Sequence, residues 1–158
     1  MNDIISAAKA EFSKAQARMT QCLVATPDEK VNWSPSPTSR TPIQLVAHAA
    51  MGTQGMSGVL QGHPFPFADF AEMDVTMRAN EKLITSREAA LALLESTSKD
   101  FLAWLDTLTA EQLTESAQSP FPPIPLASAI TFAADHIRGH SAQFEYLQTI
   151  YGDMEFRM

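Results

Sequence analysis

Three histidines have the residue type and spacing best suited to chemistry in this sequence. His136 and His140 are four residues apart in a segment with helical periodicity, so both rings project from one face, with their Cβ atoms about 5–6 Å apart. Two imidazole nitrogens at that spacing can bind the same metal ion at about 2.0–2.1 Å. His48 lies on the apolar side of another predicted helix, and metal sites in helical bundles are built from facing helices. The pattern predicts one divalent transition metal bound by His48, His136 and His140.

The alternative interpretation is three ordinary core histidines. A single histidine on an apolar face is usually a core residue with a hydrogen-bond partner. Three such rings would each need a partner, and the apolar sequence around them offers few. A shared metal satisfies all three rings, so we prefer the metal site. If only three imidazoles bind, the remaining metal positions are open to water or substrate, as in catalytic sites.

Other polar residues near these histidines have candidate supporting roles. Gln143 comes three residues after His140 and can accept the second ring N–H, which fixes the tautomer; we predict that it positions groups for catalysis. Gln44 precedes His48 by four residues and could act in the same way, although a helix cap is the better interpretation. His63 precedes a proline in a loop and is expected to be solvated rather than to be a fourth ligand.

The elements that must position these residues are helices. Four long segments repeat apolar residues every three or four positions, and none alternates as a strand does. These segments span residues 2–26, 42–61, 86–108 and 125–151. The connection 62–85 is long enough for a crossover between non-adjacent bundle positions and contains a short predicted helix near 77–83. We predict an all-α four-helix bundle forming one domain over residues 1–158.

The second predicted helix contains three glycines, Gly52, Gly55 and Gly58. Each glycine costs about 1 kcal/mol relative to alanine in a helix interior. Close approach of another backbone or of a ligand would explain that cost. Close helix packing is the better interpretation of the two.

Composition excludes several classes of function. The net charge is -7, and the 11 basic residues form no run or stripe. Proteins that bind duplex nucleic acid gain affinity by neutralising phosphates with clustered Lys and Arg, so nucleic acid is not an expected partner. No stretch approaches the roughly 20 apolar residues of a membrane span, and the first residues do not resemble a signal peptide. With Cys22 as the one cysteine, no disulfide can form within the chain. We expect a soluble cytoplasmic protein.

The sequence resembles the DinB/YfiT-like superfamily of metalloenzymes over nearly its whole length. The matching segments are Trp33–Pro35, Thr41–His48 and Asp135–Gln143, which contain one histidine, then an HxxxH pair, then a glutamine. The resemblance implies a four-helix bundle of mirror up-and-down topology, often a homodimer. It also implies that His48, His136 and His140 bind nickel or zinc. The residues alone favour the later first-row divalent ions without choosing among them.

Three functions are compatible with such a site. The resemblance implies a transferase that uses a low-molecular-weight thiol, because characterised relatives include thiol-dependent S-transferases and a thiol-dependent maleylpyruvate isomerase. A metal-bound thiol loses its proton, and the resulting thiolate can attack a small-molecule electrophile. The second function is a hydrolase, in which the metal lowers the pKa of bound water toward about 7. The third is a non-catalytic metal-binding protein in which the metal joins two helices.

Four residues have weaker functional interpretations. Arg40 or Arg78 could bind a carboxylate of the thiol or substrate, although solvated surface is the better interpretation for both. Tyr146 is a candidate hydrogen-bond donor in the pocket, although a core or interface tyrosine is the better interpretation. Asp135 is the candidate base of a hydrolase, but it points about 100° around the helix from the histidine that follows it. The family pattern is not matched in the connections 62–85 and 117–125, which are expected to border the pocket and to determine the substrate.

Overall fold

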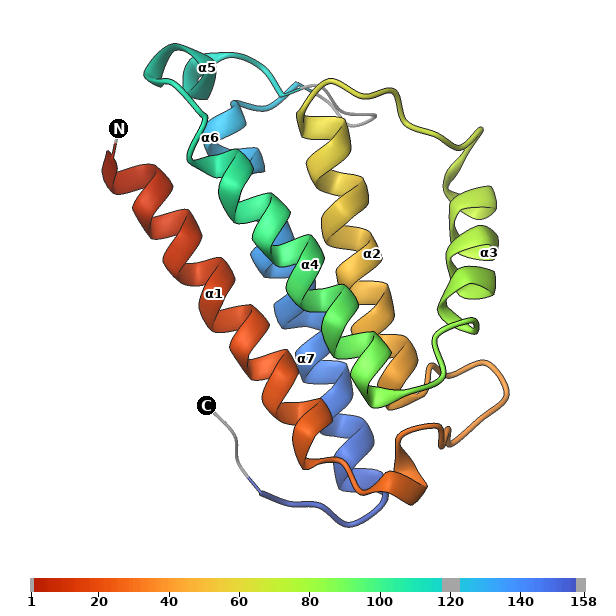
Figure 1. The fold of residues 1–158 in the computed structure, drawn as a ribbon. Helices are drawn as coiled ribbons and strands as arrows, with labels where there is room; N and C mark the ends of the chain where they lie inside the picture. Colours follow the sequence, from red (N-terminus) through yellow and green to blue (C-terminus); the bar gives the residue numbers. More distant parts are fainter. Residues whose placement is uncertain (1, 118–122, 156–158) are drawn as a thin grey trace.

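The computed structural model describes residues 2–117 and 123–155 and shows four long helices side by side (Figure 1). These are α1 (Asn2–Ala25), α2 (Pro42–Leu60), α4 (Arg87–Leu105) and α7 (Phe132–Ile150). Shorter helical elements connect them: η1 (Asp28–Lys30), α3 (Phe70–Glu81), α5 (Ala110–Thr114) and α6 (Leu126–Ala129). No named element in these two ranges is a strand. The predicted all-α four-helix bundle is confirmed.

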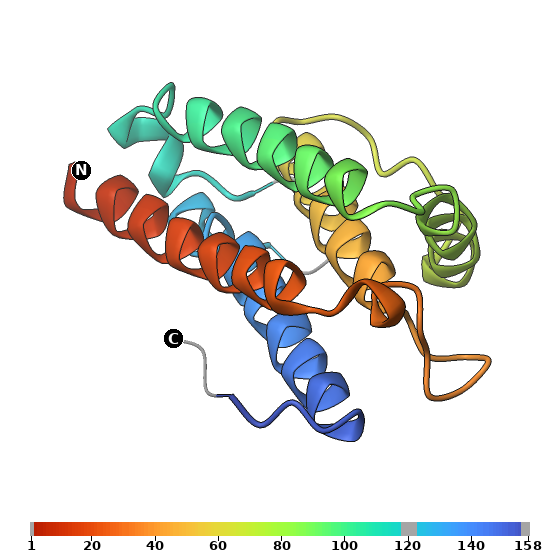
Figure 2. The same cartoon turned by 60° about the horizontal axis from the view of Figure 1, so that its bottom comes forward.

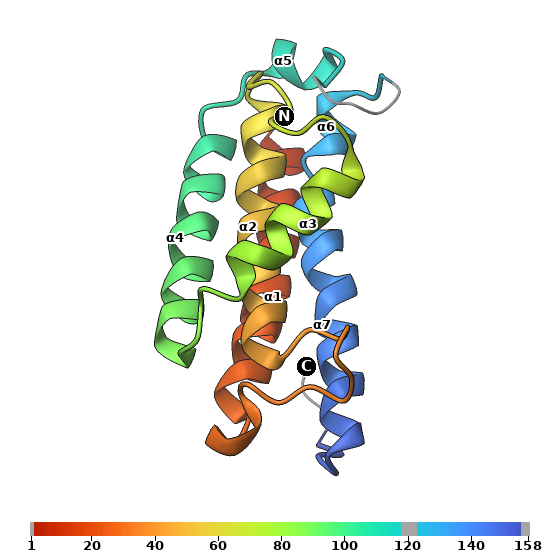
Figure 3. The ribbon, with the colours of Figure 1, turned by 90° about the vertical axis from the view of Figure 1, so that its right-hand side faces the viewer.

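Each long helix has two long neighbours in the bundle. α1 packs against α4 and α7, and α2 packs against the same two helices, so α1 and α2 occupy diagonal positions (Figure 2). α1 and α7 run in one direction, and α2 and α4 run in the other (Figure 1). The connection 62–85 joins α2 to its neighbour α4. It is therefore not the crossover between non-adjacent bundle positions that its length would permit. The connection is long because α3 carries the chain back along the outside of the bundle (Figure 3).

The core is formed by the apolar stripes of the four long helices. Phe12 on α1 and Phe101 on α4 are 0% and 1% exposed, and their ring centroids are 4.7 Å apart. Ile137 and Phe144 on α7 are fully buried against the same cluster. α2 contributes Val46 to the same cluster, and burying one such side chain contributes about 1.5–3 kcal/mol, so this core holds α2 and α7 together.

Two predicted helices differ from the structure. The segment 125–151 is two helices, because the Thr131 N–H bonds back to the carbonyl of Ser128, three residues earlier, and the turn tightens there. No proline or glycine marks this break. The helix predicted near 77–83 instead starts at Phe70, where the Asp69 side chain accepts the Glu72 N–H as a helix cap.

None of the described helices is long and apolar enough to span a membrane.

Candidate metal centre

The three predicted histidines come together between α2 and α7. Nε2 of His136 lies 3.3 Å from Nε2 of His48 and 3.1 Å from Nε2 of His140. The candidate ligand atoms of the three rings all lie within 4.8 Å of one another. Two nitrogens bound to one ion at about 2.1 Å would be ~3.0 Å apart at a right angle and ~3.4 Å apart at the tetrahedral angle. The two spacings that involve His136 therefore suit a single metal ion.

The second nitrogen of two of these rings is held by a side chain. Nδ1 of His48 lies 2.7 Å from Oε1 of Glu81, and Nδ1 of His140 lies 2.8 Å from Oε1 of Gln143. A carboxylate oxygen and an amide oxygen can only accept a hydrogen bond, so both Nδ1 atoms donate. The hydrogen of each ring is thus on Nδ1, and each Nε2 presents a lone pair to the site.

His136 is the ring that shows why a cation fits. Its Nε2 faces the lone pairs of both other rings and can donate a hydrogen to only one of them. Its Nδ1 is buried and has no hydrogen-bond partner in the described part of the chain. Three nitrogen lone pairs converging without a cation would be unfavourable, whereas a divalent ion accepts all three. The donor set present therefore fits a divalent transition metal.

The electrostatics keep two of the imidazoles neutral. Burial, followed by repulsion from His140 and His48, lowers the pKa of His136 from 6.5 to about 3. Burial, followed by repulsion from His48, lowers the pKa of His140 from 6.5 to about 4. Neutral imidazole is the form that binds a metal, so these two rings are ready to bind at neutral pH.

Glu81 at the end of α3 is a functional residue that sequence reasoning missed. It is 1% exposed, and Arg40 holds it through Nε to Oε2 at 2.7 Å and Nη2 to Oε1 at 3.1 Å. Burial raises the pKa of Glu81, but hydrogen bonds from His48 and Arg40 outweigh it, so the pKa lies below its ordinary value. The side chain is therefore an ionised, paired carboxylate that orients His48. The connection 62–85 holds four acids, and only the path of α3 selects this one.

The structure places the other sequence candidates in different roles. Gln143 contacts His140 as predicted, and its part in catalysis stays a prediction. Gln44 forms a capping box with Thr41, as the preferred interpretation held. His63 is exposed after α2 and does not belong to the histidine cluster. Asp135 pairs with Arg138 at 2.9 Å.

The expectation of solvated surface was wrong for Arg40. Its side chain is 13% exposed because the paired Glu81 lies in the interior beside it. Arg78 is 40% exposed and pairs with Asp74 at 2.9 Å. Tyr146 is 71% exposed.

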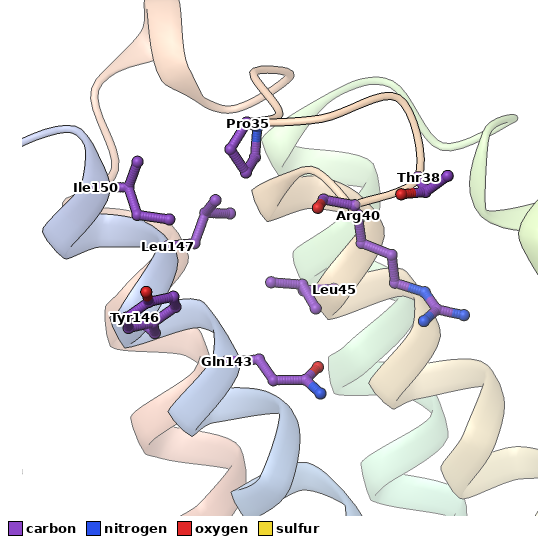
Figure 4. Close-up of a pocket in the computed structure, with 9 residues that line it drawn as sticks. Pro35, Thr38, Arg40, Leu45, Gln143, Tyr146, Leu147 and Ile150 are labelled. Carbon is purple, nitrogen blue, oxygen red and sulfur yellow. The ribbon is translucent and has the colours of Figure 1, made fainter.

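A pocket of about 310 Å³ lies between the start of α2 and the end of α7. It is bounded by the loop before α2 and by the last turns of α7 (Figure 4). Its lining includes Ser39, Arg40, Leu45, Gln143, Tyr146 and Leu147. None of the three histidines lines this pocket, and Gln143, which contacts His140, is the lining residue that connects it to the candidate metal centre. Tyr146 lines the pocket, and its role as a hydrogen-bond donor there stays a prediction.

Comparison with known families shows the superfamily of the chain. The model of the DinB superfamily matches residues 11–144. The chain belongs to the DinB superfamily. No protein with a curated description matches it.

Solved structures share the fold of this DinB-superfamily chain at low sequence identity. YfiT from Bacillus subtilis, a probable metal-dependent hydrolase with an unusual four-helix bundle topology, has a TM-score of 0.73 and 19% identity, over 96% of this chain and 90% of its own. The sibling lethal factor precursor DfsB has a TM-score of 0.73 and 18% identity, over 94% and 97%. The mycothiol-dependent maleylpyruvate isomerase has a TM-score of 0.69 and 10% identity, over 89% of this chain and 60% of its own. The expected DinB/YfiT-like bundle is confirmed.

Proposed function

We propose that this protein is a divalent-metal-dependent enzyme that transfers groups to or from the sulfur of a low-molecular-weight thiol. The observation that supports it is the convergence of three Nε2 atoms from His48, His136 and His140, two of them with tautomers set by Glu81 and Gln143. A site with three protein ligands leaves metal positions for an outside molecule, which is the catalytic arrangement. Nickel and zinc are the ions that the family resemblance leads us to expect, and imidazole ligands suit both without selecting them over copper or iron.

The residues of the chain divide the work of such a reaction. A bound divalent ion would supply stabilisation of the thiolate form of the thiol, which is the nucleophile. Glu81 and Arg40 keep His48 oriented, and Gln143 keeps His140 oriented. Leu45 and Leu147 offer apolar contacts in the adjoining pocket, where the organic parts of the thiol and its electrophile would lie.

A hydrolase is the second candidate, and the B. subtilis fold neighbour is described in those terms. Hydrolysis at such a site normally uses a carboxylate as the base beside the metal-bound water. Glu81 is engaged by Arg40 and His48, and Asp135 is engaged by Arg138. Both acids already have a charged or hydrogen-bonding partner, which favours the thiol reaction. The thiol dependence of the isomerase neighbour supports the same choice.

Cobalt substitution tests the thiol proposal, because Co²⁺ reports its ligands by absorption. Adding a small thiol to the Co²⁺-loaded protein should produce a sulfur-to-cobalt charge-transfer band. The His136→Ala/His140→Ala variant is the matched control and should give no band. Cobalt binding without any change on addition of thiol would reject the transferase and leave the hydrolase or a non-catalytic metal site.

A further inference from the structure

Gly52 lies one helical turn after His48 on α2 and faces the ring of His136 across the α2–α7 contact. A Cβ placed on Gly52 would lie 3.0 Å from Nδ1 and 3.1 Å from Nε2 of His136, and it would overlap Cε1. Ordinary contacts of a Cβ atom begin at 3.4 Å. The imidazole therefore occupies space that any other residue at this position would fill.

The backbone gives no other reason for a glycine here. Gly52 lies inside α2 and does not have a positive φ, which in the described residues is found at Gly62 and Gly152. Gly55 has nothing within 4 Å of an added Cβ, and Gly58 has only an ordinary contact, 3.4 Å from Nδ1 of His63. Of the three glycines in this helix, only Gly52 is required by space. At Gly52 the close helix packing expected from the sequence takes the form of one side chain of α7, the ring of His136, and at Gly55 no such close approach is found.

The ring that contacts Gly52 is also the ring that has no hydrogen bond at Nδ1. Glu81 fixes the ring of His48 and Gln143 fixes the ring of His140. The Nδ1 of His136 is buried without such a partner, so packing is what sets the orientation of this ring. The clash of an added methyl group with the His136 ring would be relieved most easily by rotation of the ring, because the ring is the mobile end of a side chain. That rotation would move Nε2 away from the other two nitrogens.

We propose that Gly52 is a positioning residue of the metal centre: its missing side chain sets the place of the His136 ring and so aligns the third Nε2. This inference rests on the proposed metal site and deepens it. Gly52 touches no substrate and acts only through His136.

The test compares Gly52→Ala with Gly55→Ala, which makes the same change one turn away with nothing within 4 Å. Zinc affinity, measured by competition with a chromophoric chelator, should fall at least about tenfold in Gly52→Ala and stay within about twofold of the wild type in Gly55→Ala. In the metal-free proteins, the Cε1–H resonance of His136 should shift in Gly52→Ala and stay in place in Gly55→Ala. Wild-type affinity together with an unshifted His136 resonance in Gly52→Ala would overturn the inference.

Two further arms keep the outcomes distinguishable. If the wild type binds no metal, the proposed function fails, and the His136 resonance alone decides the inference. If Gly52→Ala lowers the Tm, the added substitution His136→Ala should restore it to at least the Tm of His136→Ala alone, because removal of the ring removes the overlap. A Tm that stays low in the double variant would place the strain elsewhere and reject the role of Gly52.

Discussion

Glu81 is buried on a helix whose other described residues are exposed or only partly buried. Its carboxylate binds Arg40 on one side and His48 on the other. A buried charge persists when its partners compensate the loss of water. At the scale of single residues, the orientation of His48 therefore depends on a residue 33 positions away in the sequence.

Replacing Glu81 with glutamine tests this dependence. Glu81→Gln keeps the shape but removes the charge, so the metal affinity should fall about 10–100-fold. The free energy of unfolding should drop by about 3 kcal/mol, because the guanidinium of Arg40 loses its anion in a mostly buried place. Glu95→Gln, at an exposed position of α4, is the control for calorimetric metal titration and urea unfolding. Equal affinities in the two variants would show that Glu81 does not orient the site.

The lowered histidine pKa values predict how the stability of the metal-free protein depends on pH. His136 and His140 have pKa values of about 3 and about 4 in the folded protein, against 6.5 unperturbed. Between those values the unfolded chain binds more protons than the folded one, so stability falls as the pH is lowered from about 6.5. Urea midpoints at about pH 7, 6 and 5 should show this loss. The His136→Gln/His140→Gln variant should show a smaller loss, whereas His63→Gln should behave as the wild type.

At the scale of elements, the sequence pattern predicted the features that depend on residues close together in the chain. The long helices and the HxxxH pair follow from apolar spacing, because each helix buries one stripe. The bounds of α3 were predicted wrongly because Glu81 is its only buried residue, so no apolar stripe marks this helix in the sequence. An ion pair and a hydrogen bond position this helix instead: Arg40 lies 3.6 Å from Asp74, and Arg78 donates to the carbonyl of Thr38 at 3.2 Å. Such contacts between distant segments leave no periodic signal.

This dependence of α3 on ionic contacts predicts where the structure loosens when Arg40 is lost. Arg40→Ala should raise the rate of amide hydrogen exchange across Phe70–Glu81 and leave α4 nearly unchanged. The reason is that α3 has few apolar contacts to replace the lost ion pairs. Exchange mass spectrometry of Arg40→Ala beside Lys82→Ala, an exposed control, measures the effect. Protection of α3 that matches the wild type would contradict the account.

At the scale of the whole molecule, the bundle brings together residues 88 positions apart in the sequence. α2 and α7 are adjacent; α2 carries His48, and α7 carries the other two histidines. From the sequence, the meeting of His48 with His136 and His140 could be predicted only because a bundle fold and the family resemblance both imply it. The positions of Glu81, Arg40 and Gly52 around them required the packed structure.

A metal that joins α2 to α7 should stabilise the entire bundle. At free metal 100 times above its dissociation constant, linkage adds about 2.7 kcal/mol, which corresponds to a rise in Tm of roughly 5–11 °C for a chain of this size. Differential scanning fluorimetry with zinc, nickel and EDTA measures the shift. The His136→Ala/His140→Ala variant should show almost none, and an equal shift in that variant would place the metal elsewhere.

The central claim is that three histidines hold one metal, and metal content tests it most directly. Protein prepared without a histidine tag would be loaded with nickel or zinc, desalted and analysed by elemental mass spectrometry beside the His136→Ala/His140→Ala variant. We predict about one ion per chain in the wild type and nearly none in the variant. No bound metal in the wild type after either loading, or equal metal in both proteins, would contradict the account.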